Sequence, residues 1–316
     1  MYYIGIDLGG INIRAGIVDA QHQLCQTLSI KTSMAKGFDG LCVDMVRLCE
    51  QLVVEYGITL DEVMSIGIAC PGMINDETGE IIFSNNLDIY HSNLRERMAL
   101  KLPCPVYCAN DSNAVALGEY IIGSGEGVSS MVVLNLGIGV GSGIVMNGKI
   151  YNGFNYSGGE FGHMVIEVGG RRCTCGRKGC LETYVSTRGF IQTAKEVMKD
   201  NNDSLLWSLV KGDISCVSES IVFEARDKGD ALANRVVDTY IDYLSVGLAN
   251  IVNALQPERI AIGGFVFQQE EWLMDALQTR VDAQVFGRFG EKQTKILAAT
   301  LGNDGGIIGA SLLGRM

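Results

Sequence analysis

The sequence predicts an α/β protein built by duplication of one strand–turn–strand unit. Residues 2–20 and 132–149 each read as an apolar strand, a glycine-rich turn and a second apolar strand. When the GIV sequences in the second strands are aligned, the two glycine turns coincide and Ile11 falls over Ile138. Elsewhere, short apolar strands alternate with amphipathic helices, which is typical of α/β proteins. Two unrelated hairpins are the alternative explanation of the repeated segment.

Residue spacing and stop signals assign the alternating elements. Apolar residues at helical spacing predict helices, and short apolar runs that end in turn residues predict strands. Such a protein places its ligands at the carboxyl ends of the strands. We expect a first lobe over residues 1–117 and a second over 118–316, and leave open a return of the C-terminal helix 303–316 to the first lobe. The expected strands are 64–72, 105–111, 259–264 and 295–300, and the expected helices are 38–57, 112–123, 230–257 and 303–314.

Composition excludes several classes of partner. The chain of 316 residues is 47% hydrophobic, enough for two substantial cores, and its net charge of −11 argues against nucleic acid or an anionic membrane. We expect a cytoplasmic protein, because the sequence shows no signal peptide and no apolar run long enough to span a bilayer. Its ten cysteines are then reduced. Seven lie scattered among apolar residues and are expected to fill the core: Cys25, Cys42, Cys49, Cys70, Cys104, Cys108 and Cys216.

The other three cysteines lie close together with a histidine. One imidazole and three sulfurs are the ligands of a closed tetrahedral zinc site with a structural role, here from His163, Cys173, Cys175 and Cys180. Gly176 and Gly179 allow the tight turns that such a site needs. Flanking basic residues favour the thiolate forms: Arg171, Arg172, Arg177 and Lys178. Disulfides or a chance group of core cysteines are the alternatives, and we expect structural Zn²⁺.

Short motifs spread along the chain carry a resemblance to a known family. They are DLGG (7–10), PG (71–72), SNNL (84–87), NDSNA (110–114), LGIGVG (136–141), EFGH (160–163), CTCGRKGCLE (173–182), IGG (262–264) and NDGG (303–306). With these, the sequence resembles the ROK family of sugar kinases and sugar-responsive repressors, and within it the bacterial glucokinases. The resemblance implies an actin-like (ribonuclease H-like), duplicated two-lobed kinase fold with ATP, Mg²⁺ and a sugar in a cleft between the lobes. It also implies a homodimer or homotetramer.

The resemblance implies roles for the matching residues. Asp111, between a strand and a helix, matches the base that takes the proton of the sugar hydroxyl, with simple helix capping as the alternative. The implied sugar contacts are Asn86, Asn110, Asp111, Glu160, His163 and Glu182. The implied nucleotide and Mg²⁺ contacts are Asp7, Gly9, Gly10, Ile11, Gly137, Ile138, Gly139, Gly263, Gly264 and Phe265.

Some residues depart from the family pattern. Ile11 and Ile138 replace common threonines, Phe265 replaces a third glycine and Asn85 replaces a proline. An isoleucine cannot donate a hydrogen bond to a phosphate oxygen. We favour an ATP-dependent hexose kinase that converts glucose to glucose 6-phosphate, because Asp111 and the sugar motifs are complete. The alternative is a ROK-type sugar-binding or regulatory protein with weakened or lost ATP use.

Overall fold

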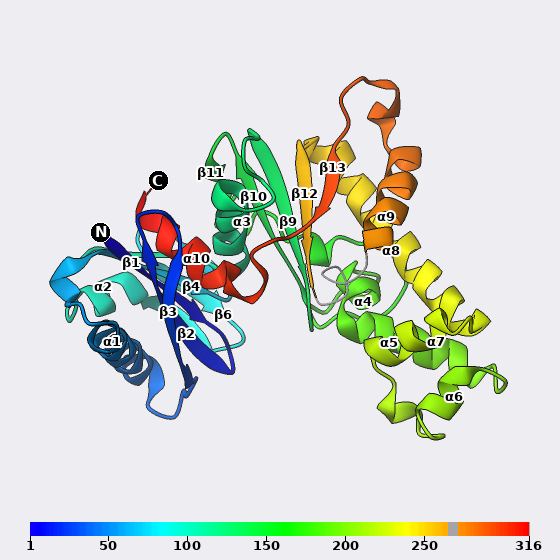
Figure 1. Cartoon of the computed structure of the whole chain (residues 1–316), viewed down its shortest axis with the longest axis horizontal. Coiled ribbons are helices and arrows are strands. Elements are labelled where there is room, and N and C mark those ends of the chain that lie inside the picture. Colours follow the sequence, from blue (N-terminus) through cyan, green and yellow to red (C-terminus); the bar gives the residue numbers. More distant parts are fainter. Residues whose placement is uncertain (265–270, 316) are drawn as a thin grey trace. The chain divides into compact units, whose positions relative to one another are not determined.

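The computed structural model describes residues 1–264 and 271–315, which form two compact units (Figure 1). The first unit holds Met1–Val133, Gly143–Gly159 and the last segment from Ala299 onward; the second holds Leu134–Ser142 and Glu160–Ala298. This division differs from the boundary expected after residue 117. That position lies inside helix α3 (Asp111–Ile122), whose neighbours in space belong to the first unit.

The first sheet has the strand order β3-β2-β1-β4-β8. The strands β1, β2 and β3 pair antiparallel, and β1, β4 and β8 pair parallel. The parallel strands β4 and β8 end side by side, with Cys70 opposite Asn110. The bounds are β1 (Tyr2–Leu8), β2 (Asn12–Asp19), β3 (Leu24–Lys31), β4 (Val63–Cys70) and β8 (Val106–Asn110).

A second sheet repeats this arrangement, with the order β11-β10-β9-β12-β13. In each sheet a hairpin comes first in the chain, β1–β2 or β9–β10, and a later strand then joins beside its first strand, as β4 does beside β1 and β12 does beside β9. The β12–β13 pair is parallel. The turn at Ile11 joins β1 to β2, and the turn at Ile138 joins β9 to β10. The equivalent turns agree with the predicted duplication. The bounds are β9 (Ser130–Leu136), β10 (Val140–Met146), β11 (Lys149–Ile150), β12 (Arg259–Gly263) and β13 (Lys295–Ala298).

Helices cover both faces of the first sheet. Ile4 and Ile6 of β1 share a core with residues of α1, whereas Gly5, which points to the opposite face, meets α10. A side chain at Gly5 would lie 1.8 Å from the backbone oxygen of Ile307, so α10 packs directly on the strand backbone. The helices of this unit are α1 (Gly37–Tyr56), α2 (Leu94–Ala99), α3 (Asp111–Ile122) and α10 (Gly305–Leu312). A small sheet contains β5 (Met73–Asn75), β6 (Glu80–Ser84) and β7 (Ile89–Asn93).

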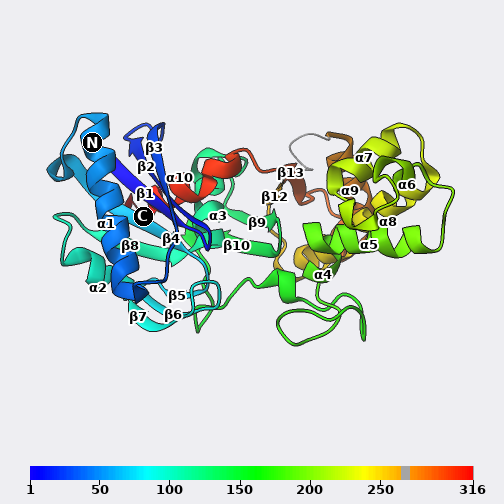
Figure 2. The ribbon, with the colours of Figure 1, turned by 90° about the horizontal axis from the view of Figure 1, so that it is seen from below.

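The second unit is mainly helical beyond its strands (Figure 2). Its core includes Phe190, whose ring lies 5.1 Å from that of Tyr240 and 5.8 Å from that of Phe223. The helices are α4 (Glu182–Val185), α5 (Thr187–Lys199), α6 (Leu205–Leu209), α7 (Glu219–Asp227), α8 (Ala231–Leu255) and α9 (Glu271–Gln284). Short 3₁₀ helices of the chain are η1 (Leu60–Glu62), η2 (Phe161–His163), η3 (Ile214–Cys216), η5 (Phe286–Phe289), η6 (Gly302–Asp304) and η7 (Leu313–Arg315).

Two predictions about the cysteines as core residues are wrong. Cys25 and Cys216 are exposed, whereas the other five scattered cysteines are buried. Cys25 lies on β3, the edge strand of its sheet, where burial alternates along the strand and every second side chain faces water. Cys216 ends the short helix η3 on the surface. Within residues 1–264 and 271–315, no helix has the length and apolar character needed to cross a lipid bilayer.

Candidate functional site

His163 and the three clustered cysteines converge on one point of the second unit. Their ligand atoms all lie within 4.8 Å of one another. The sulfurs of Cys175 and Cys180 are 3.7 Å apart, and the Cys173 sulfur is 3.7 Å from Nδ1 of His163. A tetrahedral zinc ion with Zn–S bonds of about 2.3 Å separates two sulfurs by about 3.8 Å. The donor set and its spacing therefore fit a metal ion, and the cluster can hold one.

Tight turns of the backbone produce this convergence. The N–H of Cys173 donates to the carbonyl of Arg177 at 2.9 Å, which closes a loop around Cys175. Gly179 has φ +78°, and a side chain there would lie 1.7 Å from the carbonyl oxygen of Glu167. Glycine is therefore required at this position. The backbone N–H of Arg177 lowers the pKa of the Cys175 thiol, which favours the thiolate that a metal needs.

The flanking arginines follow the expected arrangement in part: beside its backbone N–H, the charge of Arg177 also lowers the pKa of the Cys175 thiol. Arg171 does not serve the thiolates directly, because its guanidinium donates to Glu196 at 2.6 Å and lies over the ring of Tyr184 at 4.8 Å. Arg177 donates to the carbonyl oxygen of His163 at 3.4 Å. One arginine thus braces the loop against α5 and the other fixes the backbone of the histidine ligand.

Glu182 lies between the metal cluster and the second glycine turn. Its Oε1 is 3.9 Å from the Cys173 sulfur, and its Oε2 accepts the backbone N–H of Val140 at 3.0 Å. A side chain at Gly139 would lie 2.7 Å from Oε2, so glycine is needed for this approach. The metal cluster therefore fixes a carboxylate and, through it, the turn at 137–139.

The EFGH segment brings Glu160 and His163 onto the same support. Glu160 precedes η2, and its carbonyl accepts the N–H of His163 at 3.0 Å. The N–H of Phe161 donates to Oγ of Ser142 on β10 at 3.1 Å. A side chain at Gly162 would lie 2.4 Å from the carbonyl oxygen of Val140. Glu160, His163 and Glu182 are thus all tied to the β9–β10 hairpin or the cysteine loop of the second unit.

In the first unit, Asp111 is the first residue of α3. The cap of that helix is Asn110, whose side chain accepts the N–H of Asn113 at 3.1 Å. The Asp111 carboxylate accepts the N–H of Ser112 at 2.7 Å, and burial raises the pKa of this carboxyl. Asp111 is therefore not needed as the cap and is available for chemistry.

Asp7 lies near the end of β1 in the same unit. Burial raises its pKa, the negative charge of Asp111 raises it further, and Arg14, its partner across the hairpin, lowers it. Arg14 is itself paired with Asp304 at 2.6 Å. A side chain at Gly306 would lie 2.9 Å from Cγ of Asp7, so the start of α10 packs against this carboxylate. Asp7 and Asp111 are therefore close enough for the charge of one to raise the pKa of the other. Two neighbouring carboxylates of this kind are suited to a divalent cation.

The first glycine turn lies beside Asn86. A side chain at Gly10 would lie 3.8 Å from Cβ of Asn86, which is exposed. Gly9 donates to the carbonyl of Asn12 at 3.0 Å, and its own carbonyl accepts the hydroxyl of Thr32 at 2.6 Å. Ile11 follows in this turn with its side chain 66% exposed. An apolar residue this exposed contributes little to the core.

The second unit has the matching arrangement. Ile138 is 64% exposed in the turn between β9 and β10, as Ile11 is in the other repeat. Gly263 ends β12, and Gly264 has φ +144° with its Cβ position 2.5 Å from the carbonyl oxygen of Leu136. The expected nucleotide residues at 137–139 and 263–264 are therefore neighbours within this unit. Phe265 lies outside the described residues.

A family model described as "ROK family" matches residues 3–316. The chain belongs to the ROK family. A glucokinase of Halalkalibacterium halodurans is 34% identical over 313 residues, covering 99% of this chain and 94% of that protein. The structure of a ROK family glucokinase from Streptomyces griseus in complex with glucose and AMPPNP superposes with a TM-score of 0.82 at 28% identity, over 100% of this chain and 99% of that one. A xylose repressor of Caldicellulosiruptor bescii is 30% identical over 285 residues, covering 90% of this chain and 70% of the repressor.

These matches confirm the predicted family and the two-lobed α/β fold of ROK glucokinases. They support a sugar kinase, for which ATP and a divalent metal ion are expected. Repressors share the family, and a kinase is the assignment that the glucokinase matches favour.

Sequence reasoning about this ROK protein missed two groups of polar side chains. Asn113 donates to Asn152 at 2.8 Å, and Asn152 donates to Asp76 at 2.7 Å, so amides link the start of α3 to the small sheet. Glu119 is fully buried and accepts hydrogen bonds from Ser124, Thr300 and Leu301. A carboxylate inside the apolar helix pattern of 112–123 was the signal that could have identified Glu119.

Proposed function

We propose that this ROK protein is an ATP-dependent hexose kinase that transfers a phosphoryl group to the 6-hydroxyl of glucose. The observation that carries the proposal is Asp111, a half-buried carboxylate at the start of α3 whose helix is capped by another residue. Its raised pKa makes it a better proton acceptor than an ordinary aspartate. The similarity to glucokinases supports glucose as the first substrate to test.

In this mechanism Asp111 takes the proton of the sugar hydroxyl. The hydroxyl oxygen forms a bond to the γ-phosphorus of ATP, the bond from that phosphorus to the bridging oxygen breaks, and ADP leaves. Asn86, Asn110, Glu160, His163 and Glu182 bind the sugar hydroxyls, since amide and carboxylate groups can each form hydrogen bonds with two adjacent hydroxyls.

The phosphates belong to the glycine turns and Asp7. Backbone N–H groups of Gly10 and Gly139 bind the phosphate oxygens, whereas those of Gly9 and Gly137 hold the turns in shape by donating to the carbonyls of Asn12 and Gly139. Asp7 holds the hydration shell of Mg²⁺, which neutralises charge on the phosphates when bound. His163, Cys173, Cys175 and Cys180 hold Zn²⁺ in a structural role that fixes Glu182 and the turn beside it. We expect the active form to be a homodimer or homotetramer.

A second function has a specific observation in its favour. Both glycine turns present an exposed isoleucine, Ile11 and Ile138, where the family commonly has threonine, and a repressor is among the relatives. A sugar-binding regulatory protein with weakened or lost ATP use would show this pattern.

One paired experiment separates the two functions. ADP release is measured with Mg-ATP and a panel of glucose, mannose, fructose, allose and N-acetylated hexosamines, and calorimetry measures glucose and Mg-ATP binding separately. Sugar-dependent ADP release supports the kinase, with the best sugar as its substrate. Glucose binding without nucleotide binding or turnover would reject the kinase and support the regulatory protein.

A further inference from the structure

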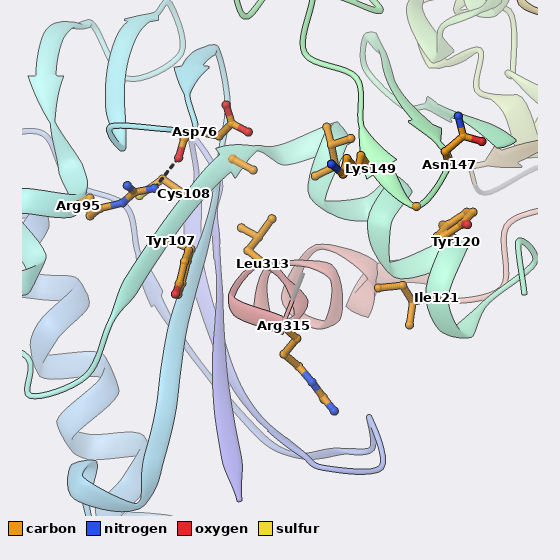
Figure 3. A pocket seen from close by; sticks show the side chains of 13 residues that line it. Asp76, Arg95, Tyr107, Cys108, Tyr120, Ile121, Asn147, Lys149, Leu313 and Arg315 are labelled. Carbon is orange, nitrogen blue, oxygen red and sulfur yellow. Dashed lines mark hydrogen bonds between the residues drawn. The ribbon is translucent and has the colours of Figure 1, made fainter. Parts of the chain in front are cut away.

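A cavity of 620 Å³ lies in the first unit and is lined by none of the residues discussed above for metal, sugar and nucleotide (Figure 3). Strand β8 forms one wall through Tyr107, and the C-terminal end of α3 forms another through Tyr120 and Ile121. The turn before β11 and the helix η7 complete it, the latter through Leu313. The volume is typical of a site for a small molecule.

The walls of the cavity are suited to the apolar or aromatic part of a ligand. Tyr107 and Tyr120 come from different elements and lie on different sides of Leu313 in Figure 3. Ile121 and Leu313 are partly buried against one small apolar cluster, which fixes this wall. Aromatic rings and branched aliphatic chains that are only partly buried gain free energy when a ligand covers them.

The charged lining is predominantly positive, although the whole chain carries a net charge of −11. Three cationic side chains, Arg95, Lys149 and Arg315, line the cavity with one carboxylate, Asp76. Lys149 is exposed and has no ion-pair partner within the part of the chain that the structure describes. In Figure 3 the guanidinium of Arg315 points away from Leu313, and it donates to the carbonyl of Ala20.

Arg95 lies at the other side of the cavity, where its guanidinium carbon is 5.9 Å from the centre of the Tyr107 ring. Its terminal N–H groups donate to the backbone carbonyls of Asp76 and Glu77, and its buried Nε–H has no acceptor within the described residues. The Asp76 carboxylate accepts instead from Asn152. Arg95 is therefore engaged by its neighbours, and Lys149 is a cation of this lining that is left without an ion-pair partner among the described residues.

From this combination of apolar walls and unsatisfied positive charge, we propose that the cavity binds a small amphiphilic anion: an aromatic or branched aliphatic body with one carboxylate, sulfonate or phosphate group. The body lies between Tyr107, Tyr120 and Leu313, and the anionic group pairs with Lys149. Ala109 of the lining directly precedes Asn110, but none of the proposed sugar or nucleotide residues lines the cavity, so the proposal stands whether or not the chain is a kinase.

The test uses the full chain and 8-anilinonaphthalene-1-sulfonate, which has an aromatic body and one sulfonate. We expect saturable fluorescence enhancement. Lys149→Gln weakens binding by about twofold to fivefold, the range for one partly exposed charge pair, and Lys149→Glu weakens it further. The matched control is Lys101→Glu, which makes the same charge change at an exposed lysine of the same unit outside the cavity and leaves binding unchanged.

Two further measurements test whether the sulfonate binds in this cavity. N-phenyl-1-naphthylamine, which lacks the sulfonate, binds more weakly than the sulfonate and is insensitive to Lys149→Glu. Hydrogen exchange shows protection of residues 105–109 and 147–150 when the sulfonate is bound. Absence of saturable binding, equal effects of Lys149→Glu and Lys101→Glu, or protection confined to other segments would overturn the proposal.

Discussion

Replacing Glu119 perturbs a fully buried carboxylate that joins three parts of the first unit. Its Oε1 accepts the backbone N–H groups of Thr300 and Leu301, both at 2.7 Å. Its Oε2 accepts the backbone N–H of Ser124 at 2.9 Å, together with the hydroxyls of Ser124 and Thr300. The carboxylate therefore fastens the end of α3 to the segment where the chain re-enters the first unit at Ala299.

The expected loss of stability follows from the number of backbone N–H groups that are left without an acceptor. Glu119→Ala removes the acceptor of three backbone N–H groups. Each unsatisfied buried donor costs about 1–3 kcal/mol, and water can replace part of this where Thr300 is exposed. We expect a loss of about 3–5 kcal/mol in the free energy of unfolding of the first unit. Glu119→Gln keeps Oε1 and turns a donor toward the Ser124 N–H, so its loss is about 1–3 kcal/mol.

Hydrogen exchange of the amides at 124, 300 and 301, combined with chemical unfolding, measures this effect. The three amides exchange faster in Glu119→Ala, whereas in Glu119→Gln only the amide of residue 124 is strongly affected. Glu126→Gln, an exposed glutamate on the loop after α3, is the matched control and changes stability by less than about 0.5 kcal/mol. Equal stability of Glu119→Gln and Glu126→Gln, or unchanged exchange at 300 and 301 in Glu119→Ala, would refute the reasoning.

Three other predictions concern the candidate site. Cys175→Ser removes one ligand of the metal cluster, so metal analysis of the purified protein shows a loss that the exposed Cys216→Ser control lacks, and a retained ion would argue against the cluster as its site. Ile11→Thr with Ile138→Thr restores two hydroxyls on exposed positions, and Mg-ATP binding measured by calorimetry tightens by about tenfold or more, at about 1 kcal/mol for each new hydrogen bond to phosphate; unchanged affinity shows that the hydroxyls are not needed. Burial raises the pKa of Asp111 in the folded protein, so its charged form costs stability at neutral pH and this cost vanishes as the pH falls through the raised pKa. Asp111→Asn therefore melts at a higher temperature than the wild type at pH 7, and the difference in melting temperature shrinks toward acidic pH. A difference that does not depend on pH would contradict a raised pKa of Asp111 in the folded protein.

Local sequence signals were sufficient for most of the fold. The helix expected at 38–57 is α1 (Gly37–Tyr56), and the strand expected at 259–264 is β12 (Arg259–Gly263), because periodic apolar residues and flanking turn residues act within the segment itself. Cys173, Cys175 and Cys180 converge as expected, since the glycines and the close spacing confine them to one loop.

The rest depends on packing between distant segments. The chain divides at residues such as Val133 and Ala298, and not after residue 117, because α3 packs against α10 from the far end of the chain. Glu119 is buried by partners that lie on the other side of the sequence, at Thr300 and Leu301. The apolar helix pattern around Glu119 can indicate its burial, but it does not identify these distant partners.

The most direct measurement for the proposed kinase combines Asp111→Asn with two assays. Glucose binding is measured by calorimetry, and glucose-dependent ADP release is measured with Mg-ATP for the wild type and the variant. If Asp111 is the base, the variant binds glucose within a few-fold of the wild type, and its kcat falls by about 10²–10⁴-fold. Turnover of the variant at the wild-type rate, or a wild type that binds glucose without releasing ADP, would contradict the proposed function.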